Sequence, residues 1–345
     1  MFHYLERMTP VHDVMQIDLT DKSLYKLFTS PEPLGVTEED IDCPTGTLSI
    51  PEMGTNFVLG MLVECQPKNF SDLLQISGLS HGTDVWSGNA QDLIKAGTCT
   101  IGTVIGTRDS IMTYLMHRGL EPDMAFKIME IVRKGNATKL LTEEHLTAMR
   151  EHGVPEWYID SCMKIKYMFP KAHAAAYQIA ALRVTWFKVY MPVEYYAAYF
   201  TVRAETFFNA EVCLQGREAV KRYYTDLEGK GRDASATEQK SATIMRVAYE
   251  ALARKVEFLP VDLYKSHATQ FLVEDGKIRL PFTSVAGLGE AAAYSIMAER
   301  ERESFFSCDD LLARTSLSST LLDTLKTMGA LGNLPNSAQV SLFDF

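Results

Sequence analysis

Apolar residues recur at helical spacing along most of the first 200 positions. Such spacing places them on one face of a helix, so each run predicts an amphipathic helix. Glycine and proline at 119–122 predict a hinge between two helices within 108–134. Short helices among turns are expected before residue 55. Further helices are predicted over 56–66, 70–79, from 142, and over 156–168, 170–189 and 195–201.

The pattern changes towards the C-terminus. Residues 205–255 predict two more helices around a charged, glycine-containing link at 228–232. Residues 262–282 alternate between apolar and polar, and Glu274-Asp275-Gly276-Lys277 is typical of a hairpin turn. Helical spacing then resumes before a polar segment at 332–337. The pattern therefore predicts a mainly α fold with one short β hairpin.

The composition is that of an ordinary globular protein, with 345 residues, 46% hydrophobic and 23% charged. This length allows two or three domains. No apolar run is long enough for a membrane span, and the first residues lack the pattern of a signal peptide. The six cysteines lie far apart without a Cys-x-x-Cys pair, which indicates a reduced, cytoplasmic protein without a cysteine-zinc site.

A net charge of −10 argues by itself against a nucleic-acid partner, but the charge is unevenly distributed. Residues 1–100 hold 14 acids and 5 bases (−9), whereas residues 101–345 hold 30 acids and 29 bases (−1). Residues 155–190 carry 2 acids and 5 bases, a balance of +3. A local basic stripe of this kind can hold a phosphate backbone although the whole chain is acidic.

The most informative segment is Phe169–Tyr177, where a proline and a run of alanines predict the start of a helix. Lys171 lies in the first turn, where the helix dipole disfavours a cation unless an anion binds beside it. His173 and Tyr177 are four residues apart and share a face, on which a base could stack. The segment therefore suggests a nucleotide site; an amphipathic core helix with a basic end is the alternative.

The segment Ser77–Asn89 contains three glycines among small polar residues and predicts a loop that another molecule can approach. Ser80, His81 and Asp84 invite comparison with a hydrolase triad. Triads assemble from distant segments, however, and the chain has no Gly-x-Ser-x-Gly elbow. Capping or turn structure and a ligand-contacting loop remain as alternatives.

Two C-terminal motifs suggest binding. Val285–Glu290, followed by a helix over 291–300, has the glycine spacing of a helix-hairpin-helix, in which Gly287 and Gly289 let backbone N–H groups approach a DNA phosphate. A weaker second unit is expected within 311–331, and a plain turn is the alternative. The segment 339–345 ends in apolar residues that could dock into a pocket or pack on the chain's own domain.

No sequence motif indicates a metal site. The one Asp-x-Asp, at 40–42, belongs to an acidic run that is typical of a solvated helix start. Two-metal phosphoryl transfer needs carboxylates on a rigid element. A Walker loop, a dinucleotide fingerprint and zinc-ligand spacing are also absent from the sequence.

Several longer runs resemble the C-terminal part of the PolC-type alpha subunit of bacterial DNA polymerase III. The pattern formed by Phe169, Lys171, His173, Ala176 and Tyr177 is shared more broadly among bacterial replicative alpha subunits. The resemblance covers the whole chain, and its most specific runs lie at 75–90, 119–135, 154–160, 167–177, 196–201 and 261–264.

The resemblance implies a fingers domain over 1–204, a helical connector over 205–258, a tandem helix-hairpin-helix region over 259–334 that grips duplex DNA, and a clamp-binding tail over 335–345. Tyr177 would stack on the base of the incoming dNTP. The residues implied to lie near the nucleotide or template are Lys171, His173, Ser80, His81, Arg108, Arg133 and Lys164. Those implied to contact DNA are Gly287, Gly289, Lys166 and Lys134, and those implied to bind the β sliding clamp are Gln339, Ser341, Leu342 and Phe343.

The family's palm domain, with its metal-binding aspartates, would lie upstream of what matches here. The resemblance therefore implies one piece of a polymerase whose Mg²⁺ ligands are not in this chain. Its partners would be primer-template DNA, dNTP, the clamp and the palm-containing part, and the chain alone is expected not to extend a primer. The alternative is a non-catalytic DNA- and clamp-binding module, and a palm-encoding frame directly upstream would argue against it.

Overall fold

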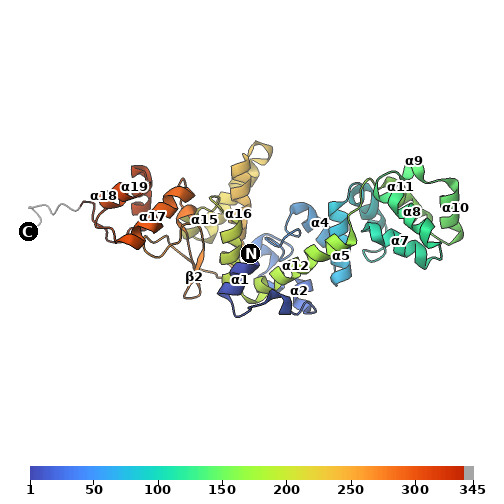
Figure 1. Cartoon of the computed structure of the whole chain (residues 1–345), viewed down its shortest axis with the longest axis horizontal. Helices are drawn as coiled ribbons and strands as arrows, with labels where there is room; N and C mark the ends of the chain where they lie inside the picture. The colour runs from blue at the N-terminus through green and yellow to red at the C-terminus, as the bar shows by residue number, and fades with distance from the viewer. Residues whose placement is uncertain (338–345) are drawn as a thin grey trace, which may run out of the picture. The chain divides into compact units, whose positions relative to one another are not determined.

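The computed structural model describes residues 1–337 (Figure 1). The chain forms two compact units, each considered by itself: a central unit, Ile17–Trp186, and a terminal unit that joins Met1–Gln16 to the chain from Phe187 onward. The four predicted clamp-binding residues, Gln339, Ser341, Leu342 and Phe343, lie outside the described residues.

The central unit is built from helices, and Figure 1 shows α7 to α11 gathered in one group. Its helices are α2 Lys22–Lys26, α3 Glu38–Ile41, α4 Asn56–Cys65, α5 Phe70–His81, α6 Gln91–Lys95, α7 Arg108–His117, α8 Pro122–Arg133, α9 Ala137–Leu140, α10 Glu143–Glu151, α11 Glu156–Lys164 and most of α12 Lys171–Tyr190. The short turns η2 Glu32–Leu34 and η3 Trp86–Ala90 complete it. The predicted helical character of this region is confirmed.

Local signals set several of these helix ends. Pro122 occupies the first turn of α8, where its missing N–H costs nothing. Gly135 follows the helix with φ +70°, a left-handed conformation that suits glycine at a helix end. Thr142 begins α10 and forms a reciprocal capping box with His145. The predicted hinge within 108–134 is therefore confirmed.

Two predictions were wrong in this unit. The expected loop over 77–89 is helical up to His81, because Gly78 serves packing rather than flexibility. A Cβ at Gly78 would lie 2.0 Å from the carbonyl oxygen of Gly106, so only glycine lets the two backbones meet. The helix expected to reach residue 168 ends at Lys164, and 165–170 connects it to α12 without helical structure.

The terminal unit combines helices with a small sheet. Its elements are α1 Phe2–Met8, η1 Val14–Gln16, α13 Pro192–Arg203, α14 Ala210–Leu214, α15 Arg217–Gly229, η4 Gly231–Asp233, α16 Ala236–Ala253, β1 Phe258–Leu259, β2 Leu272–Glu274, β3 Lys277–Arg279, η5 Phe282–Ser284, α17 Glu290–Arg302, α18 Cys308–Arg314 and α19 Ser319–Thr327. The two helices predicted within 205–255 are confirmed as α15 and α16, which pack against each other.

The sheet has the strand order β1-β3-β2. Strands β2 and β3 form the predicted antiparallel hairpin, with Val273 opposite Ile278. Asp275 and Gly276 both have positive φ, as a tight hairpin turn requires. Strand β1 pairs with β3 in parallel, and its two residues were too few to give an alternating signal.

Aromatic rings form the core beside this sheet. Phe200 of α13 lies 5.1 Å from Phe208 and 5.4 Å from Phe271, measured between ring centroids, and Phe258 of β1 is 5.7 Å from Phe208. Helix α13 therefore belongs to the terminal unit, and the compact units divide between Trp186 and Phe187. The domain limits implied by the resemblance, including the one at residue 204, stay predictions.

A fully buried ion pair lies in the same unit. The Lys188 ammonium is 2.7 Å from the Glu250 carboxylate, and neither side chain is exposed to solvent. The Tyr196 hydroxyl donates to the same carboxylate over 2.6 Å. Arg254 donates to the main-chain carbonyl oxygen of Lys188 over 2.7 Å. The network thus links the end of α12 to α13 and α16.

Candidate functional site

The non-helical segment 165–170 between α11 and α12, here called the strap, organises the site in the central unit. Thr83, just beyond α5, pairs with it: its N–H donates to the carbonyl oxygen of Tyr167 over 3.0 Å, and its own carbonyl oxygen accepts from Lys166 over 3.0 Å. Met168 of the strap is buried. The strap is therefore attached to the end of α5 by backbone hydrogen bonds, which do not depend on the exposed side chains of the strap.

The end of α8 forms the second attachment of the strap. The N–H of Met168 donates to the carbonyl oxygen of Arg133 over 3.3 Å. Gly135 then passes so close to Lys166 that a Cβ would lie 2.4 Å from the Lys166 carbonyl oxygen. This close approach brings Arg133 and Lys134 to the strap. It also explains why glycine occupies position 135, since a side chain there would collide with Lys166.

The start of α7 forms the third attachment. The Arg108 N–H donates to the carbonyl oxygen of Phe169 over 3.2 Å. The carboxylate of Asp109 accepts from the backbone N–H of Lys171 over 2.8 Å. The fold thus brings an acid from α7 to Lys171, 62 residues away in the sequence. Within residues 1–337, the next two N–H groups of α12, at Ala172 and His173, donate to no protein acceptor.

Aromatic rings run from the end of α5 along the first turns of α12. His81 stacks on Phe169 with centroids 4.7 Å apart. Phe169 meets His173 edge-on at 6.0 Å, and His173 lies 6.5 Å from Tyr177. Tyr177 ends this series of rings and is 47% exposed. The structure thus brings together three predicted site residues and adds Phe169, which belongs to the sequence motif but has no predicted role in the site.

The hydrolase alternative fails on geometry. The Ser80 hydroxyl lies 3.0 Å from Nδ1 of His81, but that nitrogen also lies 2.8 Å from the carbonyl oxygen of Ser77. A carbonyl oxygen only accepts, so Nδ1 carries the proton and cannot act as a base for Ser80. Nε2 of His81 contacts the carboxylate of Glu52 at 2.6 Å. His81 is therefore held as a positioned ring.

The basic residues around the strap are partly neutralised. Arg133 and Lys134 both contact Glu130, at 2.7 Å through Nη2 of Arg133 and at 3.1 Å through Nζ of Lys134. The hydrogen bond from Arg133 is the main cause that lowers the pKa of Glu130 to about 2. One carboxylate therefore balances two cations, and a positive charge remains.

The three lysines near the strap that Glu130 does not neutralise point elsewhere or lie exposed. Lys164 donates from Nζ to the carbonyl oxygen of Gly88 over 3.0 Å, which places it beside η3. Lys166 is exposed. Lys171 is also exposed, and it lines a pocket of about 290 Å³. The pocket's hydroxyl-bearing residues are Ser71, Thr103, Thr107, Ser110, Thr113, Tyr114 and Tyr158.

The first C-terminal hairpin is open. Residues 285–289 lead directly into α17, and Gly287 has φ +80°. Among the described residues, the N–H groups of Gly287 and Gly289 donate to no protein acceptor, and a Cβ at Gly289 would meet nothing within 4 Å. The predicted hairpin is present, but its first helix is only the short turn η5, because the preceding segment pairs with 267–268.

The second hairpin, residues 315–318 between α18 and α19, is closed by two serine side chains, one from α17 and one of its own. The Ser316 N–H donates to the hydroxyl of Ser295 on α17 over 2.9 Å. The Leu321 N–H donates to the hydroxyl of Ser318 over 3.2 Å. The two hairpins therefore differ: within residues 1–337, the N–H groups of Gly287 and Gly289 have no protein acceptor, whereas those of Ser316 and Leu321 are bonded to side chains.

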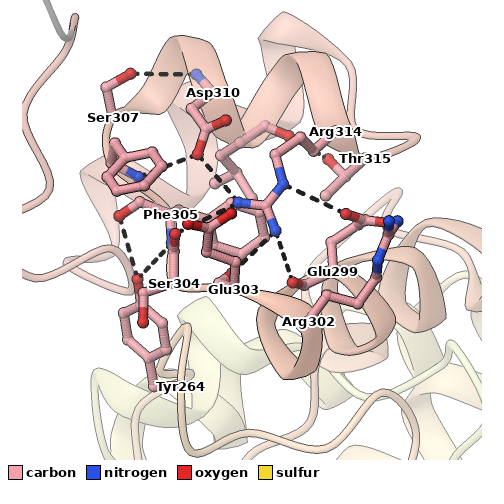
Figure 2. A network of polar contacts seen from close by, with 12 residues as sticks. Tyr264, Glu299, Arg302, Glu303, Ser304, Phe305, Ser307, Asp310, Arg314 and Thr315 are labelled. Atoms are coloured by element: carbon pink, nitrogen blue, oxygen red, sulfur yellow. Dashed lines mark hydrogen bonds and ion pairs between the residues drawn. The ribbon is translucent and has the colours of Figure 1, made fainter.

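Arg314, just before the second hairpin, ties it to the end of α17 (Figure 2). Its guanidinium donates to the carbonyl oxygens of Glu299 and Glu303 over 2.7 and 2.9 Å. It also contacts the carboxylate of Asp310 at 3.2 Å and lies 4.6 Å from the ring centre of Phe305. These bonds satisfy carbonyl groups that a helix end leaves unpaired.

Residues 1–337 contain neither a cluster of metal ligands nor a helix that could span a membrane. No group of three or more histidine, cysteine, aspartate or glutamate residues could hold a metal ion. No helix there combines the length and apolar character needed to cross a membrane. The acidic run Glu38–Ile41 is a capped, largely exposed helix.

The chain is thus a mainly helical protein with an open glycine hairpin before a helix and a basic strap beside exposed rings, features that suit the phosphates and bases of DNA. Comparison with known families agrees. Residues 3–153 match the bacterial DNA polymerase III alpha subunit finger domain, and residues 255–340 match a helix-hairpin-helix motif.

Known proteins give the particular relationship. DNA polymerase III PolC-type from Halalkalibacterium halodurans is 50% identical over 331 residues, that from Streptococcus sanguinis 51% over 337, and that from Bacillus cereus 50% over 331. Each match covers 96% of this chain and 23% of the relative. The chain is thus related to PolC-type DNA polymerase III and spans about a quarter of the length of these relatives.

Proposed function

We propose that this chain is the part of a replicative DNA polymerase that binds the incoming dNTP and the primer-template DNA. The observation that carries the proposal is the series of rings that ends at exposed Tyr177, next to free N–H groups at the start of α12. An aromatic face stacks on any base, and helix N–H groups suit phosphate oxygens. Both binding elements lie on one helix of the central unit.

Some of the site residues would contact the base of the dNTP and others its phosphates. Tyr177 stacks on the base, and His173 supports its ring from the preceding turn. Lys171 supplies a cation for the triphosphate. Arg108, whose backbone N–H bonds to a carbonyl oxygen of the strap and whose guanidinium lies 3.7 Å from the Asp109 carboxylate, is assigned to the same phosphates. Asp109 holds one N–H of α12, and so orients the helix start without occupying the next two donors.

The polymerase reaction as a whole needs divalent metal, and Mg²⁺ would stabilise the charge that develops during phosphoryl transfer. The described residues do not fit such an ion, because no three suitable ligands lie together. We therefore assign metal binding to the palm-containing part and only positioning to this chain. Clamp binding by Gln339, Ser341, Leu342 and Phe343 rests on the resemblance and is proposed as well.

Replacing Tyr177 with alanine should raise the KM for dNTP about tenfold or more, since stacking on an aromatic ring contributes roughly 1–3 kcal/mol per base. The measurement is steady-state primer extension by the chain combined with a palm-containing part of a PolC-type relative. Tyr177→Phe keeps the ring and should stay within about threefold of the unaltered protein. An unchanged KM for Tyr177→Ala would remove the stacking role.

Replacing Gly289 with valine should weaken binding of the chain to blunt duplex DNA about tenfold, because a side chain would keep the phosphate from the N–H groups of the hairpin. The substitution should fold normally, since Gly289 has φ −77° and open space around it. Fluorescence anisotropy with a labelled duplex measures the affinity.

The matched control is Ser318→Ala at the corresponding position of the second hairpin. It removes a cap worth about 1 kcal/mol of stability, but should leave duplex affinity unchanged because that hairpin is already closed. Equal losses in both variants would argue against phosphate binding by the first hairpin. A normal dNTP KM in Tyr177→Ala, together with lost duplex binding in Gly289→Val, would favour the non-catalytic module.

A further inference from the structure

Tyr167 is an exposed ring on a fixed backbone. Its carbonyl oxygen and its N–H both bond to Thr83, over 3.0 and 3.3 Å. The side chain is 45% exposed, and within residues 1–337 it has no ring contact and its hydroxyl has no hydrogen bond. The structure therefore holds the residue in place while leaving the face of its ring without a partner.

Such a ring is suited to binding. A residue whose backbone is already ordered loses little conformational freedom when its side chain is covered, so most of the contact energy is retained in affinity. Aromatic rings also bury a large apolar area with only two side-chain torsions to fix. An exposed tyrosine without such anchoring would lack the first of these advantages.

The charges around Tyr167 select the kind of partner. Arg133, Lys134 and Lys166 lie along the strap, opposed by Glu130 and by Asp84, which follows Thr83. The balance of these five side chains is positive. The pKa of Arg133 is raised, mainly by its hydrogen bond with Glu130 and in part by the nearby Tyr167 hydroxyl, which places this cation close to the ring.

A flat ring among cations matches one class of ligand well. Proteins hold single-stranded nucleic acid by stacking its bases on aromatic rings while basic groups follow its phosphates. A duplex fits poorly, because its bases are already stacked on one another and present no free face. An acidic protein would use the cations but has no need of an exposed, pre-positioned ring.

The position of Tyr167 on the strap indicates which DNA strand it would bind. Tyr167 lies two residues before Phe169, which belongs to the series of rings ending at Tyr177. We propose that Tyr167 stacks on an unpaired base of the single-stranded template ahead of the primer end, with Lys134 and Lys166 along its phosphates. This inference rests on the proposed binding of primer-template DNA and assigns the unpaired strand to a residue outside the nucleotide site.

The test compares two labelled DNAs with the same duplex, one blunt and one with a 5′ single-stranded template overhang, by fluorescence anisotropy with the full chain. The unaltered protein should bind the overhang DNA more tightly. Tyr167→Ala and Tyr167→Leu should each lose this advantage, about tenfold if one stacked base is involved. Tyr167→Phe should keep it.

The matched control is Phe126→Ala on α8, which removes another exposed ring of the same unit, 51% exposed, and should leave both affinities unchanged. Three results would overturn the inference: no overhang advantage in the unaltered protein, an advantage that survives both Tyr167→Ala and Tyr167→Leu, or an equal loss on blunt DNA. If Gly289→Val left the affinity for blunt duplex DNA unchanged, that result would count against the proposed duplex binding. A failure of this inference and a failure of the proposed function are therefore distinguishable.

Discussion

Replacing Lys188 with methionine is expected to lower the free energy of unfolding by about 3–5 kcal/mol, the range seen when one partner of a buried ion pair is removed. Lys188 and Glu250 are both fully buried and 2.7 Å apart. Methionine has a similar length but no charge, so the Glu250 carboxylate would be left without its counter-ion in a site closed to solvent. Tyr196 still donates to it, but a neutral hydroxyl does not balance a full charge.

Urea unfolding of the full chain measures the effect. The double variant Lys188→Met with Glu250→Leu is the control, because it leaves no uncompensated charge. Replacing a buried ion pair with apolar residues often leaves the stability unchanged or raises it. Arg254 would keep its bond, since it donates to the main-chain carbonyl oxygen of residue 188. A single variant within about 1 kcal/mol of the unaltered protein would show that the pair contributes little.

Replacing Gly135 with alanine should cost about 2–5 kcal/mol and also raise the KM for dNTP. The left-handed backbone at φ +70° disfavours any Cβ by about 1–2 kcal/mol. The added carbon would further lie 2.4 Å from the carbonyl oxygen and 2.8 Å from Cα of Lys166. Backbone atoms cannot turn aside as a flexible side chain does, so the strap itself would have to move, at a cost of about 1–3 kcal/mol.

Gly153→Ala separates the two contributions. Gly153 has the same φ of +70°, but its nearest neighbour for a Cβ is the end of the Arg118 side chain at 3.7 Å, an ordinary contact. This variant should show the backbone cost alone and leave the KM unchanged. Equal stability losses and an unchanged KM in both variants would show that the contact between Gly135 and Lys166 does not matter. Thermal unfolding and primer extension with a supplied palm-containing part provide the two measurements.

The parts of the fold that sequence predicted are those specified by a few neighbouring residues. Pro122 starts a helix, Gly276 completes a hairpin turn, and Gly287 allows a left-handed turn before α17. Each acts through its own backbone, so the signal is local. The same holds for His173 and Tyr177, whose spacing alone places them on one face.

The rest of the site depends on contacts between distant segments, which leave no periodic signal. Asp109 caps α12 from α7, and Thr83 pairs with Tyr167 from beyond α5. The misread glycine at position 78 shows the same difficulty. Glycine favours loops in general, and only the neighbouring backbone of Gly106 reveals that close packing is its reason here. The sequence pattern places Tyr167 in a helix, whereas in the structure α11 ends three residues before it.

The strap also sets a limit on how this region tolerates changes in length. Surface connections usually accept insertions and deletions, because no fixed partner depends on their residue count. Here Thr83, Arg133 and Arg108 bond to successive positions between Lys166 and Phe169. Adding or removing a single residue would shift all later positions against those partners and turn the start of α12 away from Asp109. The number of residues between α11 and α12 is therefore as important to the proposed nucleotide site as the identity of its side chains.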